Sequence, residues 1–185
     1  MPNLRPPAYG NPLMPLTEED LRQVFEDLGI AYQIERHPPL FTVEESQALR
    51  GDLPGAHVKN MFLKDKKGGL WLTTCLEHRR FKIRSLEKAV GAQKMSFGKP
   101  DLLWDVLGVK PGAVTPLALA NDRQGRQVNV ILDAQMLLED IINVHPLHNE
   151  ATVAIQSADL LRFLDWTGHA PARVDFDALE AAAVG

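Results

Sequence analysis

The sequence has very few of the residues that several classes of protein depend on. Cys75 is its single cysteine, so no intramolecular disulfide can form and a cysteine-based metal cluster is not expected. No apolar run approaches the roughly 20 residues that a membrane-spanning helix requires, and the first residues lack the apolar core of a secretory signal. These absences lead us to expect a cytoplasmic protein with no membrane partner.

The chain also lacks the fingerprints of common cofactor and nucleophile sites. It contains no P-loop, no dinucleotide-binding glycine pattern and no Gly-x-Ser-x-Gly nucleophile elbow. His145 and His148 lie close together, but neither this pair nor the other histidines have a spacing typical of zinc ligands. We therefore expect neither a cofactor nor a metal ion, and we interpret Cys75 as a small core residue.

An excess of positive charge is absent as well. The formal net charge of -4 argues against a general nucleic-acid coat protein, which would be basic. The positive residues are nevertheless uneven, and a basic run between positions 79 and 99 is interrupted mainly by Glu87. This basic run is either a solvated helix face or a local patch that contacts phosphate groups. It consists of Arg79, Arg80, Lys82, Arg84, Lys88, Lys94 and Lys99.

The remaining composition is that of a globular domain, with 45% hydrophobic and 24% charged residues. A chain of 185 residues is most simply one domain, which we expect over residues 16–170. The prolines within residues 1–15 predict a flexible arm, because proline cannot propagate a helix or a central strand. Residues 171–185 are expected to form a loose tail with some helical potential in 178–183.

Helix signals and short strand signals alternate along the chain. Thr17 is a favourable N-cap for a helix that Gly29 can end, and hairpin signals outnumber β-α-β signals. We predict an α/β fold of the α+β kind, with a mixed, largely antiparallel sheet that is curled or closed into a barrel-like core and surrounded by helices. The expected strands are 31–36, 56–64, 70–75, 117–120, 128–132, 141–144 and 151–155. The expected helices are 18–28, 42–49, 85–90, 100–107, 134–138 and 157–167.

Lys59 occupies an unusual place in the predicted strand 56–64. By the period of two in a strand, it shares a face with Met61 and Leu63. A lysine on an apolar face is costly unless its ammonium group is paired or meets an anionic ligand. Lys59 therefore either sits near a strand end and reaches solvent, as most lysines do, or awaits an anion.

Residues Gly112–Pro116 have the pattern Gly-x-x-x-Pro. Many loops with this pattern are only turns. A glycine-permitted backbone can also direct consecutive N–H groups toward a carbonyl or phosphate oxygen, which would form an oxyanion cradle.

Five segments follow one another in a characteristic order. They are His37–Glu45, Val58–Leu63, Ser96–Gly98, Gly112–Pro116 and His145–Thr152. Together they resemble the YbaK/ProX family of free-standing aminoacyl-tRNA deacylases, which is related to the editing domain inserted in bacterial prolyl-tRNA synthetases. The resemblance covers about residues 17–168. Lys59-Asn60 on a strand, followed by the Gly-x-x-x-Pro loop, is its most specific combination.

The Pro-Leu-x-Asn-x-x-Thr element at residues 146–152 is similar to the alanine-specific branch of this family, often called ProX or PrdX. That resemblance implies a trans-editing hydrolase that deacylates mischarged Ala-tRNA(Pro) and preserves fidelity at proline codons. The cysteine-specific YbaK branch usually lacks the element, so deacylation of Cys-tRNA(Pro) is a second hypothesis. A non-catalytic regulatory module that binds tRNA or another nucleic acid is a third, because the chain has a basic run and no standard nucleophile.

The resemblance also implies a site without a protein nucleophile, in which the 2′-hydroxyl of the substrate and a water molecule act on the ester. Lys59 would position the terminal phosphate or the ester and counter its developing charge. Backbone groups of the loop from Gly112 would hold the carbonyl oxygen or the α-amino group, and Asn60 would orient substrate or water. The implied substrate contacts are Thr42, Met61, Ala113, Val114, Thr115, Pro116, His148 and Asn149.

The implied partner is aminoacyl-tRNA, with prolyl-tRNA synthetase or an elongation factor as a transient companion. A cramped apolar pocket would accept alanine and exclude the larger proline ring. Candidate walls of that pocket are Met61, Leu63, Val130 and Leu147. The predicted contacts to the tRNA acceptor stem are Arg79, Arg80, Lys82, Arg84, Lys94 and Lys99.

Overall fold

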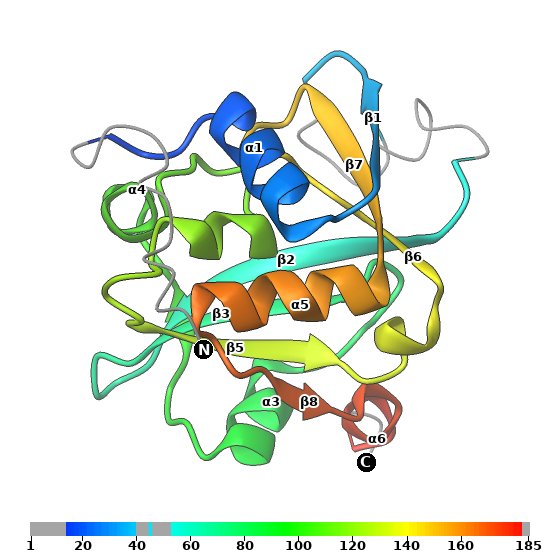
Figure 1. Cartoon of the computed structure of the whole chain (residues 1–185). Coiled ribbons are helices and arrows are strands. Elements are labelled where there is room, and N and C mark those ends of the chain that lie inside the picture. The colour runs from blue at the N-terminus through cyan, green and yellow to red at the C-terminus, as the bar shows by residue number, and fades with distance from the viewer. Residues whose placement is uncertain (1–13, 40–44, 46–52, 183–185) are drawn as a thin grey trace, which may run out of the picture.

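The computed structural model describes residues 14–39, 45 and 53–182 (Figure 1). The described α-helices are α1 (Glu18–Leu28), α3 (Ile83–Val90), α4 (Pro100–Leu107), α5 (Ser157–Thr167) and α6 (Phe176–Ala181), and the short 3-10 helices are η1 (Pro116–Ala120) and η2 (Met136–Leu138). The strands are β1 (Tyr32–Arg36), β2 (Ala56–Lys64), β3 (Leu70–Leu76), β4 (Ser96–Phe97), β5 (Val128–Asp133), β6 (Ile141–Val144), β7 (Ala151–Gln156) and β8 (Ala172–Val174).

The strands form one mixed sheet in the order β1-β7-β6-β2-β3-β5-β8, with β4 added beside β2. The pairs β1–β7, β2–β3, β2–β4 and β6–β7 are antiparallel, whereas β2–β6, β3–β5 and β5–β8 are parallel. Figure 1 shows β1 and β7 crossing the direction of β2, β3 and β5. The predicted mixed, largely antiparallel and curled sheet is confirmed. In the described chain it stays open, with β1 and β8 at its two ends.

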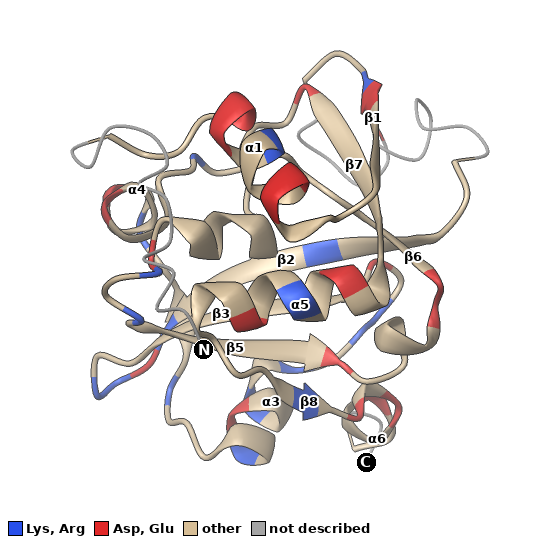
Figure 2. Ribbon diagram, viewed as in Figure 1, with Lys and Arg blue, Asp and Glu red and all other residues tan. Residues whose placement is uncertain are grey.

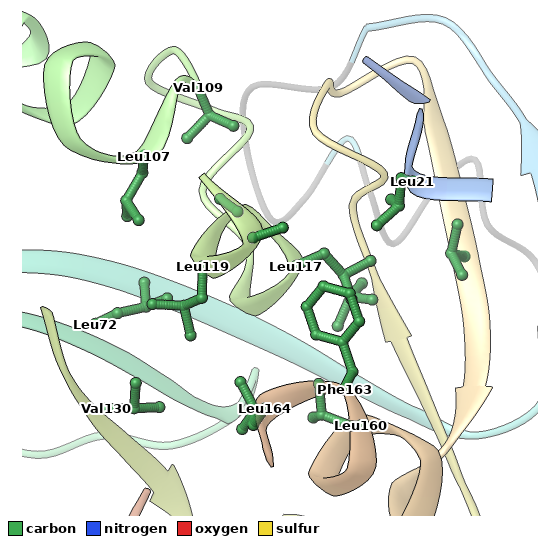
Figure 3. Packing of buried hydrophobic residues seen from close by; sticks show 14 of the residues in the cluster. Leu21, Leu72, Leu107, Val109, Leu117, Leu119, Val130, Leu160, Phe163 and Leu164 are labelled. Carbon is green, nitrogen blue, oxygen red and sulfur yellow. The ribbon is translucent and has the colours of Figure 1, made fainter. Parts of the chain in front are cut away.

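The sheet buries residues on both faces. On one face, η1 and α5 pack against the central strands, and Figure 3 shows Leu119 beside Leu72 and Leu117 beside Phe163. We call this the first cluster. The second cluster lies on the other face, where α3 and α6 cover Leu63, Cys75 and Ile131. Because neighbouring strand residues point to opposite faces, Phe62 belongs to the first cluster and Leu63 to the second.

The boundaries of α1 follow from its sequence. Thr17 and Asp20 form a reciprocal capping box, and Gly29 closes the helix at φ 63°. Gly108 closes α4 in the same conformation, and it has a second reason for its lack of a side chain, since an added Cβ would lie 2.4 Å from the Pro15 side chain. The Leu16 N–H also donates to Asn121 Oδ1 at 2.8 Å. The end of the predicted proline-rich arm is thus tied to the domain.

The predicted strand over residues 117–120 is wrong. Residues Pro116–Ala120 form η1, in which the Thr115 hydroxyl accepts a hydrogen bond from the Leu117 N–H. Every side chain of η1 is buried, so the apolar run carries no periodicity that would distinguish a buried strand from a buried helix.

The predicted loose tail is also wrong over its described part. Residues Ala172–Val174 form β8 beside β5, and Phe176–Ala181 form α6. Val174, Phe176 and Leu179 are buried in the second cluster. Their burial depends on a surface that residues distant in the sequence supply, so the local sequence of the segment underestimates its order.

The helix predicted over residues 42–49 lies outside the described residues except for Glu45, which is helical. None of the described helices is both long enough and apolar enough to cross a lipid bilayer.

Candidate functional site

Lys59 lies on β2 opposite Cys75 of β3, on the face of the second cluster. Its side chain is partly buried, and its ammonium group donates a hydrogen bond to the carbonyl oxygen of Arg79. The same Nζ atom is 5.6 Å from the centre of the Phe81 ring. A carbonyl oxygen and an aromatic face together offset the cost of removing the ammonium group from water. An ammonium group has three donor hydrogens, and among the described residues only the Arg79 carbonyl oxygen accepts one of them.

Asn60 points to the other face of the sheet. Its Oδ1 atom accepts a hydrogen bond of 2.7 Å from the Thr74 hydroxyl across the β2–β3 pair. Lys59 and Asn60 are adjacent in the sequence, but the alternation of a strand directs their side chains apart. The structure therefore does not bring these two predicted catalytic side chains together.

The Gly112–Pro116 loop is a turn that leads into η1. Gly112 has φ 89°, and the Ala113 N–H donates to the Lys110 carbonyl oxygen at 3.0 Å, so that amide is engaged within the turn. Ala113 is buried in the first cluster and Val114 packs against it, while Thr115 and Pro116 are buried. The buried part of this loop and the Lys59 side chain thus belong to opposite faces of the sheet.

His148 fixes the turn between β6 and β7 to helix α1. Its Nε2 atom lies 2.6 Å from a carboxylate oxygen of Glu18, while its Nδ1 atom accepts from the Glu150 N–H at 3.2 Å. Because Nδ1 accepts a hydrogen bond, the ring proton is on Nε2, which donates a hydrogen bond to the Glu18 carboxylate. Asn149 lies beside His148 in the same turn and is partly buried.

Glu18 is held by several donors at once. Burial alone would raise its pKa, but hydrogen bonds from Arg36, His148 and Arg22 outweigh burial and hold the pKa of Glu18 at about 2. The carboxylate therefore remains charged over the whole neutral range. The turn that His148 occupies is anchored to a permanent negative charge at the start of α1.

The same turn contains a strained residue. Leu147 has φ 72°, in the left-handed region that branched residues seldom occupy. Such a conformation costs on the order of 1–3 kcal/mol and persists only when the surroundings impose it. Here Leu147 packs against the first cluster and His148 is bound to Glu18, so the side chains of these two adjacent residues are both held in place. Strain of this kind favours a functional role for the turn.

His145 is a candidate that the sequence reasoning missed, because it weighed this residue only as a metal ligand. Its Nδ1 atom is 3.3 Å from the Ala151 carbonyl oxygen, which can only accept, so Nδ1 carries the proton and the unprotonated Nε2 can accept a hydrogen bond. Burial lowers the pKa of His145, and the nearby His37 and His148 lower it further, against the raising effect of the Ala151 carbonyl. The ring is neutral at neutral pH. The signal in the sequence was a His-Pro pair directly after a buried strand.

His37 completes this group of histidines. Its Nε2 atom is 3.0 Å from the Thr152 hydroxyl, and its backbone N–H donates to the Glu150 carbonyl oxygen at 3.1 Å. His37 lies a few residues before Thr42, a predicted substrate contact that falls outside the described residues. In the part of the chain that is described, no group of three or more His, Cys, Asp or Glu residues is arranged to hold a metal ion.

The prediction that Arg79 contacts tRNA is wrong. Arg79 is 3% exposed, and its guanidinium group is paired with Asp133, Asp177 and Glu180. The other members of the basic run differ, because they are exposed along α3, where Figure 2 shows positive residues, and along the segments that flank it up to the start of α4. They are Arg80, Lys82, Arg84, Lys88, Lys94 and Lys99. These residues remain available to phosphate groups.

Two of the predicted pocket walls are core residues on opposite faces of the sheet. Leu63 is buried in the second cluster and Val130 in the first, while Met61 and Leu147 are partly buried. Cys75 is fully buried as expected, and burial raises its pKa to about 12. Its thiol is protonated at neutral pH and unsuited to act as a nucleophile.

A separate groove of about 400 Å³ lies between α3, β5 and β8. Trp71, Arg126, His169 and Arg173 contribute to its lining. Val130, a predicted pocket wall, is among its lining residues, but neither Lys59 nor His145 or His148 is, so the groove is distinct from the surroundings of Lys59 and from the histidines of the β6–β7 turn.

The chain belongs to the aminoacyl-tRNA editing domain family, whose model matches residues 37–163. The match includes Lys59, the Gly112–Pro116 loop and the β6–β7 turn. Helix α6 lies outside it.

Several similar proteins carry names that refer to prolyl-tRNA synthetase or to prolyl-tRNA editing. It is 37% identical over 161 residues to "Prolyl-tRNA synthetase associated domain-containing protein 1" of Danio rerio, covering 86% of this chain and 87% of that protein. It is 30% identical over 145 residues to "Prolyl-tRNA editing protein ProX" of Acetoanaerobium sticklandii, covering 78% and 88%. A crystal structure of a candidate trans-editing enzyme for prolyl-tRNA synthetase has the same fold, with a TM-score of 0.61, 19% identity and coverage of 84% and 96%.

Proposed function

We propose that this protein is a trans-editing hydrolase that removes alanine from mischarged Ala-tRNA(Pro). The observation that carries the proposal is the family match over residues 37–163, supported by 30% identity to a bacterial protein named for prolyl-tRNA editing. The element Pro146–Thr152, on which the resemblance to the alanine-specific branch rests, lies within the matched region. Removal of alanine would return uncharged tRNA(Pro) and keep alanine out of proline codons.

The reaction is the hydrolysis of an ester. A water oxygen attacks the carbonyl carbon of the alanyl group, the bond from that carbon to the ribose oxygen breaks, and a proton passes to the ribose oxygen. Negative charge develops on the carbonyl oxygen before the bond breaks, so a positioned cation or N–H group lowers the barrier. We assign this cation to Lys59, whose ammonium group donates one hydrogen to the Arg79 carbonyl oxygen and has two more that can donate to a substrate.

The state of the other candidate groups supports a mechanism without a covalent enzyme intermediate. The buried thiol of Cys75 is protonated, as its pKa of about 12 requires. His145 is neutral and has an electron pair at Nε2, which suits a group that accepts a hydrogen bond from water. We assign His145 to orienting the water or the ribose hydroxyl. His148, which is already bound to Glu18, would shape the turn beside it.

The proposed partner is the acceptor stem of tRNA(Pro). The exposed residues around α3 would contact its phosphate groups, since an otherwise acidic protein needs a local basic surface to approach RNA. A transient association with prolyl-tRNA synthetase or an elongation factor would deliver the mischarged tRNA. We expect this work to take place in the cytoplasm.

A deacylation panel tests the proposal. Purified protein is incubated with Ala-, Pro-, Cys- and Ser-tRNA(Pro), and the release of each amino acid is followed over time. We expect rapid release of alanine and no release of proline above the uncatalysed rate. Preferential release of cysteine would instead indicate activity of the YbaK type. Equal binding of charged and uncharged tRNA(Pro) without any turnover would indicate a non-catalytic binding module.

A further inference from the structure

Helix α6 lies outside the region that matches the editing-domain family, yet it contacts the groups that surround Lys59. In Figure 1 this helix follows β8 at the end of the described chain, and β8 pairs with β5. Asp175 caps the helix by accepting a hydrogen bond from the Ala178 N–H at 3.2 Å. Phe176 and Leu179 then bury its inner face in the second cluster. The helix is therefore a fixed part of the fold.

The first contact runs through a single peptide group. The carbonyl oxygen of Arg79 accepts the hydrogen bond from the Lys59 ammonium group. The N–H of the same peptide group belongs to Arg80, and it donates to the carboxylate of Glu180 on α6. Glu180, the 79–80 peptide and Lys59 thus form one chain of hydrogen bonds. In such a chain each bond polarises the next, so the charge of Glu180 strengthens the carbonyl as an acceptor.

The second contact holds the Arg79 side chain. Its guanidinium group donates to Glu180 at 3.0 Å and also to Asp177, both on α6. On its other side it donates to Asp133 at 2.9 Å. Because the guanidinium group is buried and fully paired, the backbone that carries the Arg79 carbonyl has little freedom to move.

The third contact concerns the aromatic ring beside Lys59. Phe81 packs edge-to-face against Phe176 of α6, with ring centres 4.9 Å apart and an interplanar angle of 86°. Both groups that surround the ammonium, the 79–80 peptide and the Phe81 ring, are thus held by the same short helix.

We infer that α6 positions the Lys59 ammonium group, and that Glu180 is the positioning residue through which it acts. A lysine side chain has four rotatable carbon bonds, so a catalytic lysine loses much of its advantage unless neighbours hold it. Glu180 does not touch substrate in this role. It holds the 79–80 peptide in place, and the carbonyl oxygen of that peptide holds the Lys59 ammonium group. The inference rests on the proposed catalytic role of Lys59.

The test compares two carboxylates of the same helix. Glu180→Ala removes an acceptor from Arg79 and also releases the Arg80 N–H. Asp177→Ala removes an acceptor from Arg79 but leaves the 79–80 peptide untouched, so it is the matched control. Glu180→Gln is the conservative variant, because its amide oxygen can still accept from the Arg80 N–H.

The first readout does not depend on enzymatic activity. Each protein is treated briefly with an amine-acylating reagent, and labelling of Lys59 relative to the exposed Lys64 is measured by mass spectrometry. We expect labelling of Lys59 to rise about fivefold in Glu180→Ala, to stay near the wild-type value in Asp177→Ala, and to return toward it in Glu180→Gln. Equal labelling in wild type and Glu180→Ala would overturn the inference. An equal rise in Asp177→Ala would also overturn it, because the effect would then be a general loosening of α6.

The second readout is deacylation of Ala-tRNA(Pro). We expect kcat to fall about tenfold in Glu180→Ala with KM changed less than about twofold, since substrate contacts remain. An unchanged kcat alongside increased Lys59 labelling would overturn the positioning role. If the wild-type protein has no deacylase activity but the labelling results hold, then the proposed function fails while the structural role of Glu180 stands.

Discussion

Two ion networks hold distant parts of this molecule, and they have opposite charges at their centres. At the start of α1, the carboxylate of Glu18 accepts hydrogen bonds from several side chains, which are Arg22, Arg36 and His148. After β3, the guanidinium group of Arg79 donates to several carboxylates, which are Asp133, Asp177 and Glu180. Figure 1 shows α1 and α6, the two helices involved, at opposite ends of the fold. Each network ties a helix to a part of the candidate site.

The two networks differ in burial, and that difference decides what each one does. The side chains of Arg79 and Asp133 are 4% and 0% exposed, whereas those of Glu18 and Arg36 are 15% and 56% exposed. Solvent and salt weaken the Glu18 network, while the buried pair of Arg79 and Asp133 is shielded from both. A buried pair is costly to break because the remaining charge has no water to stabilise it. The Arg79 network should therefore govern stability, and the Glu18 network should respond to pH.

The largest effect should come from breaking the buried network. Arg79→Met leaves the Asp133 carboxylate buried without its cation, which should lower the free energy of unfolding by about 3–5 kcal/mol. Urea unfolding monitored by circular dichroism measures this change. The double variant Arg79→Met with Asp133→Asn should recover part of the loss, because it no longer buries an unpaired charge. If the double variant recovers no stability, the pair stabilises the fold mainly through side-chain packing and not through its charges.

The next effect concerns catalysis rather than stability. Lys59→Ala should reduce kcat for Ala-tRNA(Pro) by about 100-fold, the loss typical of a group that stabilises a developing oxyanion. Lys64→Ala is the control, because Lys64 lies on the same strand with an exposed side chain. Single-turnover deacylation measures both variants. Comparable activity of the two would remove Lys59 from the site while leaving the family assignment intact.

The Glu18 network should show itself in the pH dependence of stability. The folded-state pKa of Glu18, about 2, lies below the ordinary glutamate pKa of 4.5, so the network stabilises the fold above pH 4.5 and this stabilisation is lost as the pH falls toward 2. Solvent screening of the exposed Arg36 reduces this contribution below what the pKa of Glu18 alone would give. Glu18→Gln should therefore have a lower free energy of unfolding than wild type at pH 7. The difference between the two free energies should become smaller as the pH falls from 4 to 2. A difference in unfolding free energy that does not change with pH would contradict an origin in the charge of Glu18.

The smallest effect is expected on the exposed basic surface. The double variant Arg84→Ala with Lys88→Ala should weaken tRNA binding while leaving the melting temperature nearly unchanged. Each lost phosphate contact should reduce the slope of log affinity against log salt by about 1. Filter binding at several salt concentrations measures the slope. Exposed Glu26→Gln, remote from the basic run in the sequence, is the control and should bind as wild type.

Local sequence signals were sufficient where the residues of a segment specify its structure without distant partners. The capping box at Thr17 and the glycines after α1, α3, α4 and α5 marked the helix ends correctly. Hairpin and strand patterns gave the pairing of β2 with β3. The same approach missed η1, because a fully buried run has no amphipathic period. It gave the segment of α6 only some helical potential within a loose tail, because a short helix has little stability of its own.

The sequence by itself determined which residues were chemically unusual, since a lysine between apolar neighbours and a Gly-x-x-x-Pro loop can be recognised in the order of the amino acids alone. Only the tertiary structure decided how they are used. It put Lys59 and the buried part of the loop on opposite faces of the sheet, and it buried Arg79 among carboxylates that are distant in the sequence. Partners of that kind come from chain topology, because the charge of a residue does not specify which distant segment will fold against it.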